Sequence, residues 1–183
     1  MACVGRLAVE KNVDAFLALD LPGTKLVIGD GPERARLAQR YPQVRFAGYR
    51  FGAELAALLS GADVLVFPSL TDTFGLVMVE ALACGVPVAA FPVPGPLDVI
   101  EPSVTGVLHA DLRRAVAAAL QLDRAACVRA ANGFSWHAAT NQFLSGLAPI
   151  PLPLRARLAV SRSSAIIARM ATRRQTSGAG DAN

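Results

Sequence analysis

The sequence predicts an α/β fold, a doubly wound parallel sheet with helices on both faces. Short apolar runs typical of strands alternate with helical segments along most of the 183 residues, and such alternation is typical of parallel sheets. The composition agrees, because 53% hydrophobic and 17% charged residues suit one compact domain with a sizeable core. We expect this domain to span residues 1–146 and a linker and tail to occupy residues 147–183.

Six apolar runs have the length and composition of buried strands. They are residues 2–4, 25–29, 44–47, 64–67, 86–91 and 106–108. The first strand is central in a doubly wound sheet, where strands commonly run about five to six residues. We therefore expect the start of the chain to interrupt an element that begins further upstream.

Six segments between and after these runs have helical character. They are residues 13–19, 33–40, 53–60, 76–83, 112–122 and 135–144. Pro32 fits the first turn of the second helix. Three prolines, Pro149, Pro151 and Pro153, then predict an extended linker.

The distribution of charge argues against a nucleic-acid partner. The net charge is +4, yet residues 1–154 carry 12 basic and 13 acidic side chains, whereas residues 155–183 carry six arginines and one aspartate. The excess of positive charge therefore belongs to the tail, where no aromatic residues are interleaved with the arginines.

The cysteines and the apolar runs indicate in which cellular compartment the protein is located. Cys3, Cys84 and Cys127 are widely spaced and odd in number, so we expect reduced core cysteines and neither a disulfide framework nor a zinc site. No run approaches the ~20 apolar residues of a membrane-spanning helix, and no signal-peptide pattern follows Met1. We expect a cytoplasmic protein.

Two cations follow the first strand in the segment G-R-L-A-V-E-K-N. Open α/β sheets bind ligands at the carboxyl ends of their strands, so Arg6 and Lys11 are placed to hold a diphosphate and to stabilise charge on it as it leaves. The alternative is a pair of solvated surface charges, with Glu10 pairing locally.

The segment Gly29-Asp30-Gly31-Pro32 follows the second strand and opens a helix. It lacks the third glycine of a dinucleotide-binding loop, so a nicotinamide or flavin site is disfavoured. We expect a tight turn in which the backbone of Gly29 and Gly31 approaches a ligand closely.

Two carboxylates flank a glycine in otherwise apolar sequence between residues 69 and 88. The periodicity predicts that Glu80 lies in a buried helix, where an ionised carboxylate needs a fixed donor or the hydroxyl groups of a ligand. Asp72, Thr73, Phe74 and Gly75 precede that helix, whose N-terminus attracts anions. A capping role for Asp72 or Thr73 is the alternative.

His109 and His137 are isolated, with no second histidine at metal-ligand spacing and no evident nucleophile beside them. We therefore interpret both as structural. The sequence contains no cluster that predicts a metal held by the protein.

Four motifs, in order, resemble the C-terminal, nucleotide-sugar-binding half of GT-B fold retaining glycosyltransferases of family 4, also called group 1. The motifs are V-G-R-L-A-V-E-K-N, V-I-G-D-G-P, A-D-V-L-V-F-P-S and T-D-T-F-G-L-V-M-V-E-A-L-A-C-G-V-P-V. The resemblance extends over about residues 3–146 and implies a Rossmann-like domain of a hexosyltransferase.

The resemblance also implies roles for single residues. Arg6 and Lys11 would hold the donor diphosphate, Glu80 would accept hydrogen bonds from the ribose hydroxyls, and Asp72 would contact the transferred sugar. The family usually has glutamate in place of Asp72. The shorter carboxylate affects which sugar is bound more than it affects the reaction. The implied donor-binding set is Arg6, Lys11, Gly29, Gly31, Tyr49, Arg50, Asp72, Thr73, Phe74, Gly75, Leu76 and Glu80, of which Arg6, Lys11 and Asp72 are the catalytic candidates.

The resemblance further implies a GDP-mannose or UDP-hexose donor, retained anomeric configuration and no protein-bound metal or other cofactor. The base would bind near Tyr49 and Arg50. A lipid or glycan acceptor would bind an N-terminal domain that this sequence lacks. The alternative hypotheses are a non-catalytic nucleotide-binding module that needs a partner domain and a fragment with no ligand function.

Residues 155–174 are rich in arginine, alanine and serine. This composition favours a solvated, disordered tail. The alternative is a basic helix in weak contact with an anionic membrane surface, which would place the protein at the inner face of the membrane.

Overall fold

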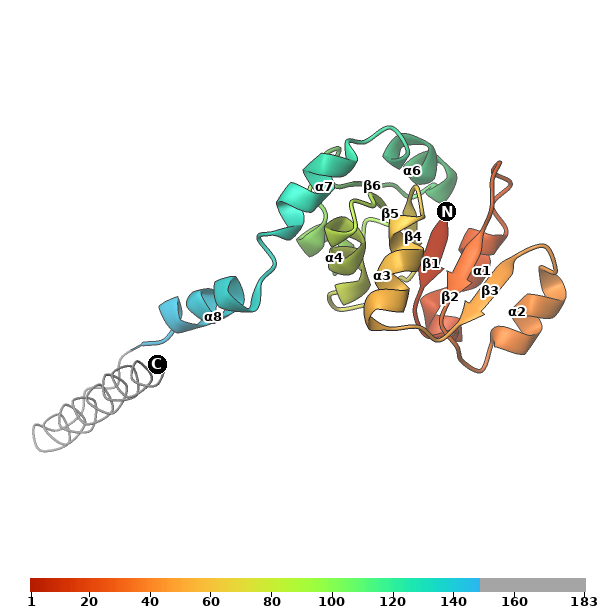
Figure 1. The fold of residues 1–183 in the computed structure, drawn as a ribbon, viewed down its shortest axis with the longest axis horizontal. Helices are drawn as coiled ribbons and strands as arrows, with labels where there is room; N and C mark the ends of the chain where they lie inside the picture. Colours follow the sequence, from red (N-terminus) through yellow and green to blue (C-terminus); the bar gives the residue numbers. More distant parts are fainter. Residues whose placement is uncertain (149–183) are drawn as a thin grey trace, which may run out of the picture. The chain divides into compact units, whose positions relative to one another are not determined.

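A six-stranded parallel sheet is the centre of the computed structural model, which describes residues 1–148. The strands are β1 (Ala2–Val4), β2 (Leu26–Ile28), β3 (Arg45–Gly48), β4 (Leu65–Phe67), β5 (Val88–Ala90) and β6 (Gly106–Leu108). Their order across the sheet is β3-β2-β1-β4-β5-β6, with every neighbouring pair parallel. Figure 1 shows β1 between β2 and β4. The predicted doubly wound, Rossmann-like fold is confirmed.

Helices lie between these strands and after the last of them. They are the 3₁₀ turn η1 (Val9–Lys11) and the α-helices α1 (Val13–Leu17), α2 (Arg34–Arg40), α3 (Gly52–Ser60), α4 (Leu76–Ala83), α5 (Pro96–Val99), α6 (Leu112–Ala119), α7 (Arg124–Ala131) and α8 (Trp136–Ser145). Every predicted strand and helix is present, several with shorter bounds, whereas η1, α5 and α7 were not predicted.

The expected helix over residues 112–122 is wrong at its end, because α6 stops at Ala119 and a new helix starts a few residues later. Asp123 caps α7, and its carboxylate accepts hydrogen bonds from the backbone N–H groups of Ala125 and Ala126. An aspartate before a helical run is a start signal that the sequence does contain.

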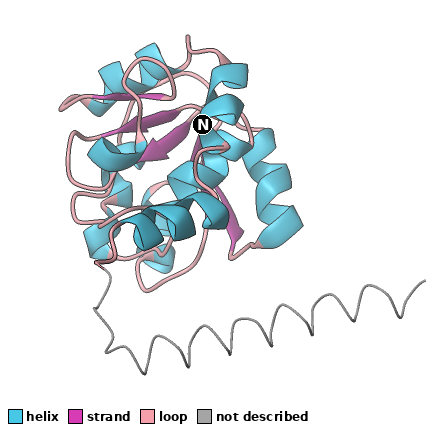
Figure 2. Ribbon diagram, turned by 90° about the vertical axis from the view of Figure 1, so that its left-hand side faces the viewer, coloured by secondary structure: helices cyan, strands magenta, loops and turns pink. Residues whose placement is uncertain are grey.

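Apolar cores lie on both faces of the sheet. Successive residues of a strand point to opposite faces, and β4 shows the division. Val66 packs in the core with α1, α2 and α6, whereas Leu65 and Phe67 pack with α3, α4, α5 and α7. Figure 2 shows the strands enclosed by helices.

The three cysteines are free thiols, as expected, and two of them are fully buried. Cys3 and Cys127 are buried, and burial raises the pKa of the Cys3 thiol to about 12. Cys84, the C-cap residue of α4, is partly buried and packs against the core.

Residues 1–139 form one compact unit, and a second unit begins at Thr140. Among residues 1–148, no helix is both long and apolar enough to span a bilayer. The predicted basic tail and the three prolines lie outside the described residues.

Candidate functional site

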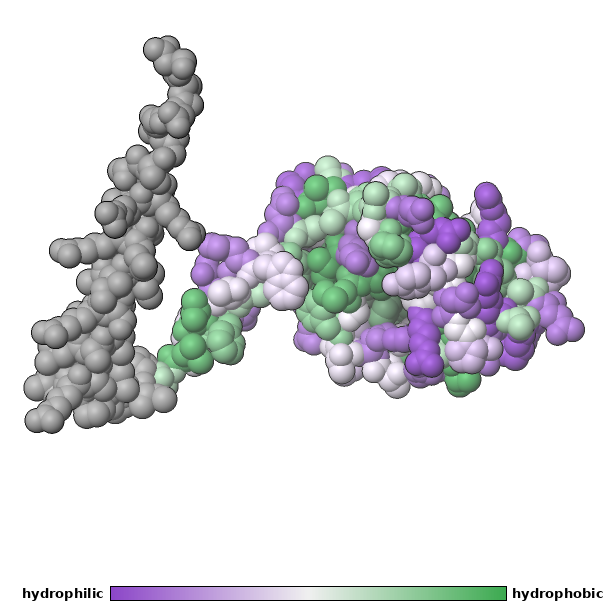
Figure 3. Space-filling model, turned by 60° about the horizontal axis from the view of Figure 1, so that its bottom comes forward, coloured by the Kyte–Doolittle hydropathy of each residue, from purple (hydrophilic) through white to green (hydrophobic). Residues whose placement is uncertain are grey.

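The carboxyl ends of β1 and β4 define the candidate site. The two strands are neighbours in the sheet, but the chain leaves β1 toward α1 on one face and leaves β4 toward α4 on the other. Such a switch point is where open α/β sheets bind ligands. Figure 3 turns this edge of the sheet toward the viewer and shows hydrophilic and hydrophobic residues mixed on it.

The loop after β1 carries both predicted cations. Leu7 and Ala8 are buried and anchor the loop, which leaves the Arg6 side chain exposed. Lys11 ends the 3₁₀ turn η1. Asn12 then adopts a left-handed conformation with φ 51°, and its Nδ2 donates a hydrogen bond to the backbone oxygen of Pro68, 3.1 Å away.

The loop after β4 lies against the loop after β1. The buried Ser69 hydroxyl donates to the backbone oxygen of Glu10 at 3.4 Å. Lys11 Nζ donates to Asp72 Oδ1 at 2.5 Å, so an ion pair joins residues that are 61 positions apart in the sequence. The structure thus brings Lys11 and Asp72 together, and Asp72 serves as a partner of this cation.

The capping alternative for Asp72 and Thr73 does not hold. Gly75 is the N-cap residue of α4, and no side chain accepts a cap hydrogen bond there. Gly75 has φ 78°, and a Cβ at this position would lie 2.8 Å from Met78 Cε and 2.9 Å from Phe67. Met78 N–H donates to the oxygen of Gly75 at 2.9 Å. The first N–H groups of a helix have no acceptor one turn earlier within it, so those of Leu76 and Val77 can serve an anion.

The expectation that Glu80 is buried is wrong. Only Met78, Ala81 and Leu82 of α4 are buried, and Glu80 is exposed on another side of the helix. The helix is apolar along most of its length, so periodicity alone did not reveal which side faces solvent. Water can solvate the Glu80 carboxylate, and its presence does not by itself require a ligand.

The turn after β2 approaches the chain itself. A Cβ on Gly29 would lie 1.9 Å from the backbone oxygen of Gly5, and a Cβ on Gly31 would lie 2.4 Å from that of Leu7. Leu7 N–H also donates to the oxygen of Asp30 at 2.8 Å. The close approach expected toward a ligand is therefore made to the β1 loop, which these glycines position.

Exposed aromatic side chains follow β3. Tyr49 is 67% exposed and Phe51 71% exposed, with ring centroids 5.9 Å apart. Arg50 lies between them, donates to the oxygen of Tyr49 at 2.8 Å and pairs with Glu54 at 3.6 Å. Sequence reasoning had named Tyr49 and Arg50 but not Phe51, although the Y-R-F pattern was visible.

Phe74 in the β4 loop also has a partner that sequence reasoning missed. Its ring lies edge-on to that of Phe134, with centroids 6.3 Å apart. Phe134 follows α7, an element that was not predicted. Thr73 and Leu76 are exposed on either side of this loop.

Sequence comparison decides the family. The profile of the family described as "Glycosyl transferases group 1" matches residues 1–122, which is more than half of the chain. The chain belongs to the group 1 glycosyltransferases.

Curated relatives of this glycosyltransferase chain carry transferase names. A GDP-mannose-dependent alpha-mannosyltransferase of Mycobacterium tuberculosis is 45% identical over 107 residues, which are 57% of this chain and 28% of the relative. A D-inositol 3-phosphate glycosyltransferase of Mycolicibacterium paratuberculosis is 35% identical over 172 residues, covering 79% of this chain and 39% of the relative. The chain thus spans well under half the length of these relatives.

Solved structures of glycosyltransferases share the fold. The pneumococcal O-GlcNAc transferase GtfA in complex with UDP and GlcNAc matches with a TM-score of 0.62 and 25% identity, over 79% of this chain and 34% of that one. The lipopolysaccharide outer core galactosyltransferase WaaB matches with a TM-score of 0.65 and 19% identity, over 80% and 49%.

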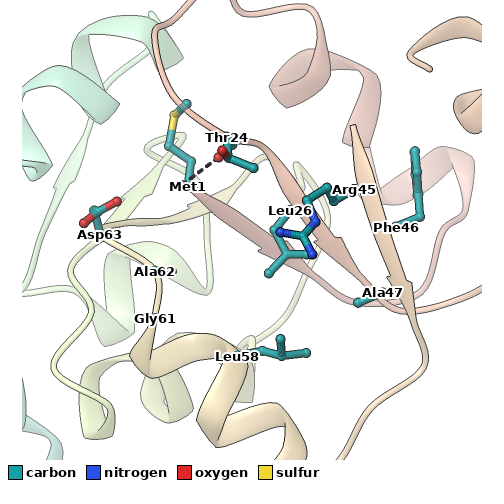
Figure 4. A pocket seen from close by; sticks show the side chains of 10 residues that line it. All are labelled: Met1, Thr24, Leu26, Arg45, Phe46, Ala47, Leu58, Gly61, Ala62 and Asp63. Carbon is teal, nitrogen blue, oxygen red and sulfur yellow. Dashed lines mark hydrogen bonds between the residues drawn. The ribbon is translucent and has the colours of Figure 1, made fainter. Parts of the chain in front are cut away.

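A hollow in this glycosyltransferase chain lies at the opposite, amino end of the strands. Figure 4 shows it between Met1, Thr24, Arg45 and Asp63. It contains none of the residues predicted to bind the donor, and the amino ends of strands are not where such sheets bind ligands.

The described part of the chain contains no cluster of potential metal ligands. Within residues 1–148, no group of three or more His, Cys, Asp or Glu side chains could hold a metal ion. His109 accepts a hydrogen bond from Asp111 N–H at 2.8 Å, a local contact that supports its structural interpretation.

Proposed function

We propose that this chain is the donor-binding half of a retaining glycosyltransferase that binds a nucleoside diphosphate sugar. The observations that carry the proposal are the Lys11–Asp72 ion pair where β1 and β4 part and the small pocket beside it that both Arg6 and Lys11 line. Two cations and a carboxylate there match the two parts of such a donor, an anionic diphosphate and a sugar rich in hydroxyl groups.

Arg6 and Lys11 would bind the diphosphate. When the glycosidic bond to it breaks, negative charge grows on the leaving phosphate oxygens, and cations already in place stabilise that charge. The N-terminus of α4 at Gly75 and Leu76 would add backbone N–H groups. In this proposal the protein uses its own cations rather than a protein-held metal.

The remaining predicted residues would bind the other parts of the donor. Asp72 would accept hydrogen bonds from the sugar, and the exposed Glu80 carboxylate from the ribose hydroxyls. Tyr49 and Arg50, whose side chains are accessible after β3, would contact the base. The mannosyltransferase relative named as GDP-mannose-dependent favours GDP-mannose as donor, and the UDP in the complex of GtfA supports a UDP-sugar as the alternative.

The acceptor, a lipid or glycan, would bind a part of the enzyme outside this chain, since the curated relatives are more than twice as long. We also propose a cytoplasmic site of action. Contact of the basic tail with an anionic membrane surface would suit a lipid acceptor.

Thermal unfolding of the 183-residue chain with GDP, UDP, GDP-mannose and UDP-glucose tests donor binding. A ligand at a hundredfold excess over its dissociation constant stabilises the folded state by ~2.7 kcal/mol. We expect stabilisation by one base only, with Arg6→Ala and Glu80→Gln requiring more ligand for the same shift.

Arg113→Ala is the matched control, because it removes an exposed arginine from α6, away from the site. Its response to nucleotide should equal that of the wild type. A cooperative transition that no nucleotide moves would refute the proposed donor site.

A further inference from the structure

The two charged groups proposed to bind different parts of the donor are already bound to each other. Lys11 Nζ lies 2.5 Å from Asp72 Oδ1, and the two side chains are only 29% and 20% exposed. Arg6, in contrast, is exposed. A phosphate can therefore reach Arg6 directly but must compete with Asp72 for Lys11.

The ion pair is fixed by contacts from three loops. Asn12 binds the oxygen of Pro68, and Ser69 binds the oxygen of Glu10, so the loops after β1 and β4 are joined on either side of the pair. The backbone of Gly95, in the loop after β5, packs against the backbone of Asp72, since a Cβ on Gly95 would lie 2.8 Å from the backbone oxygen of Asp72. The backbone of Asp72 has little room to retreat from Lys11.

We propose that Asp72 competes with the donor phosphates for Lys11 and thereby makes the site select nucleotide sugars over the nucleoside diphosphate alone. The inference rests on the proposed function. When Lys11 turns to a phosphate, Asp72 loses its cation while partly buried, and a carboxylate left without a partner there is costly.

A bound sugar offsets the free-energy cost of the unpaired Asp72 carboxylate, whereas the diphosphate alone does not. Hydroxyl groups of a bound sugar can donate to the Asp72 carboxylate. At the place of the sugar, a nucleoside diphosphate offers only the oxygens of its terminal phosphate, which are acceptors at neutral pH. Asp72 therefore weakens binding of the product left after sugar transfer more than binding of the intact donor, which favours release of that product.

The test is the affinity of GDP and GDP-mannose, or of the UDP pair if the wild type binds UDP, measured by calorimetry in a double-mutant cycle. We expect Asp72→Ala to bind the diphosphate about fivefold tighter, the ratio equivalent to about 1 kcal/mol, without tightening the nucleotide sugar. In a Lys11→Met background, Asp72→Ala should tighten diphosphate binding less, because only the direct repulsion between the carboxylate and the phosphates is then relieved.

Asp98→Ala is the control for a general loss of negative charge, because Asp98 is an exposed aspartate on α5, after β5. Asp72→Asn keeps the size of the side chain and serves as the second variant. If Asp98→Ala tightens diphosphate binding as much as Asp72→Ala, or if neither Asp72 variant tightens it, the selectivity proposal is overturned.

The failure of the proposed function gives a different result. A wild-type chain that binds neither nucleotide nor nucleotide sugar would refute the donor site itself. Binding of both ligands with an affinity ratio that Asp72 does not change would refute only the selectivity inference.

Discussion

Gly29 is a position at which any side chain would clash with the backbone of the β1 loop. Its φ is 138°, and an added Cβ would lie 1.9 Å from the oxygen of Gly5. Both partners are backbone, so neither can rotate away, and the β1 loop that carries Arg6 and Lys11 would have to move.

Gly29→Ala should therefore lower the free energy of unfolding by about 2 kcal/mol or more, measured by urea denaturation. Gly61→Ala is the control. Gly61 has φ −81°, and a Cβ added to it would lie 3.7 Å from the nearest atom, the backbone oxygen of Leu58. We expect that variant to be neutral or slightly stabilised. Equal effects of the two substitutions would show that the β1 and β2 loops do not meet as described.

Glu80 and Asp72 show which properties of a site residue can be predicted from the sequence and which cannot. The two carboxylates were predicted as site residues from their type and spacing, but the burial assigned to Glu80 was wrong. Exposure depends on what other elements cover, and helix periodicity in an apolar segment does not contain that information.

At the scale of elements, a polar cluster joins α1 to α2. Asp14 on α1 binds Arg36 of α2, accepts a hydrogen bond from Tyr41 Oη at 3.1 Å and lies 3.4 Å from a guanidinium nitrogen of Arg40. The hydrogen bond from Arg36 is the main cause that lowers the pKa of Asp14, with a smaller contribution from Tyr41.

The pH dependence follows from the sign of that shift. Because the pKa is lower in the folded state, the contribution of Asp14 is present above its unfolded pKa of about 3.9 and is lost as the pH falls through the folded value. Asp14→Asn should lower the free energy of unfolding by roughly 1 kcal/mol at pH 7, and the difference from wild type should shrink below about pH 4.

Urea denaturation between pH 3 and 7 measures this difference, with Asp98→Asn as the control at an exposed carboxylate. A difference between Asp14→Asn and wild type that stays constant over that range would contradict the assignment.

Most elements could be predicted because apolar runs and turn residues are local signals. The six strands were found in that way, as were α1, α2, α3, α4 and α8 within a few residues. Helix α5 has only four residues, and α7 follows α6 so closely that the two were not separated. Short elements leave too few positions for a period to be recognised.

At the scale of the whole molecule, strand order determines the site. The pair Lys11–Asp72 forms because β4 lies next to β1, although two other strands intervene in the sequence. The parallel sheet predicted from the sequence implies that the loops after β1 and β4 lie at the same edge. The sequence contained no local signal for their direct contact, which depends on the packing of segments far apart in the chain.

The extent of the folded domain is the remaining prediction at this scale. Among the described residues, the two cores contain side chains from Ala2 to Ala131, and no residue of α8 is buried. We therefore expect a chain that ends at residue 146 to unfold cooperatively, with a midpoint within about 2 °C of the full chain, because less than about 1 kcal/mol is lost.

A chain that ends at residue 122 provides the contrast, since it lacks α7 and with it the buried Cys127 and Ala131 that pack against α4. Exposing the apolar surface of α4 should lower the unfolding midpoint strongly or abolish the transition. Calorimetry of the three chains separates the possibilities. A large loss of stability already at residue 146 would show that residues beyond it support the fold and that the domain boundary proposed from the sequence lies too early.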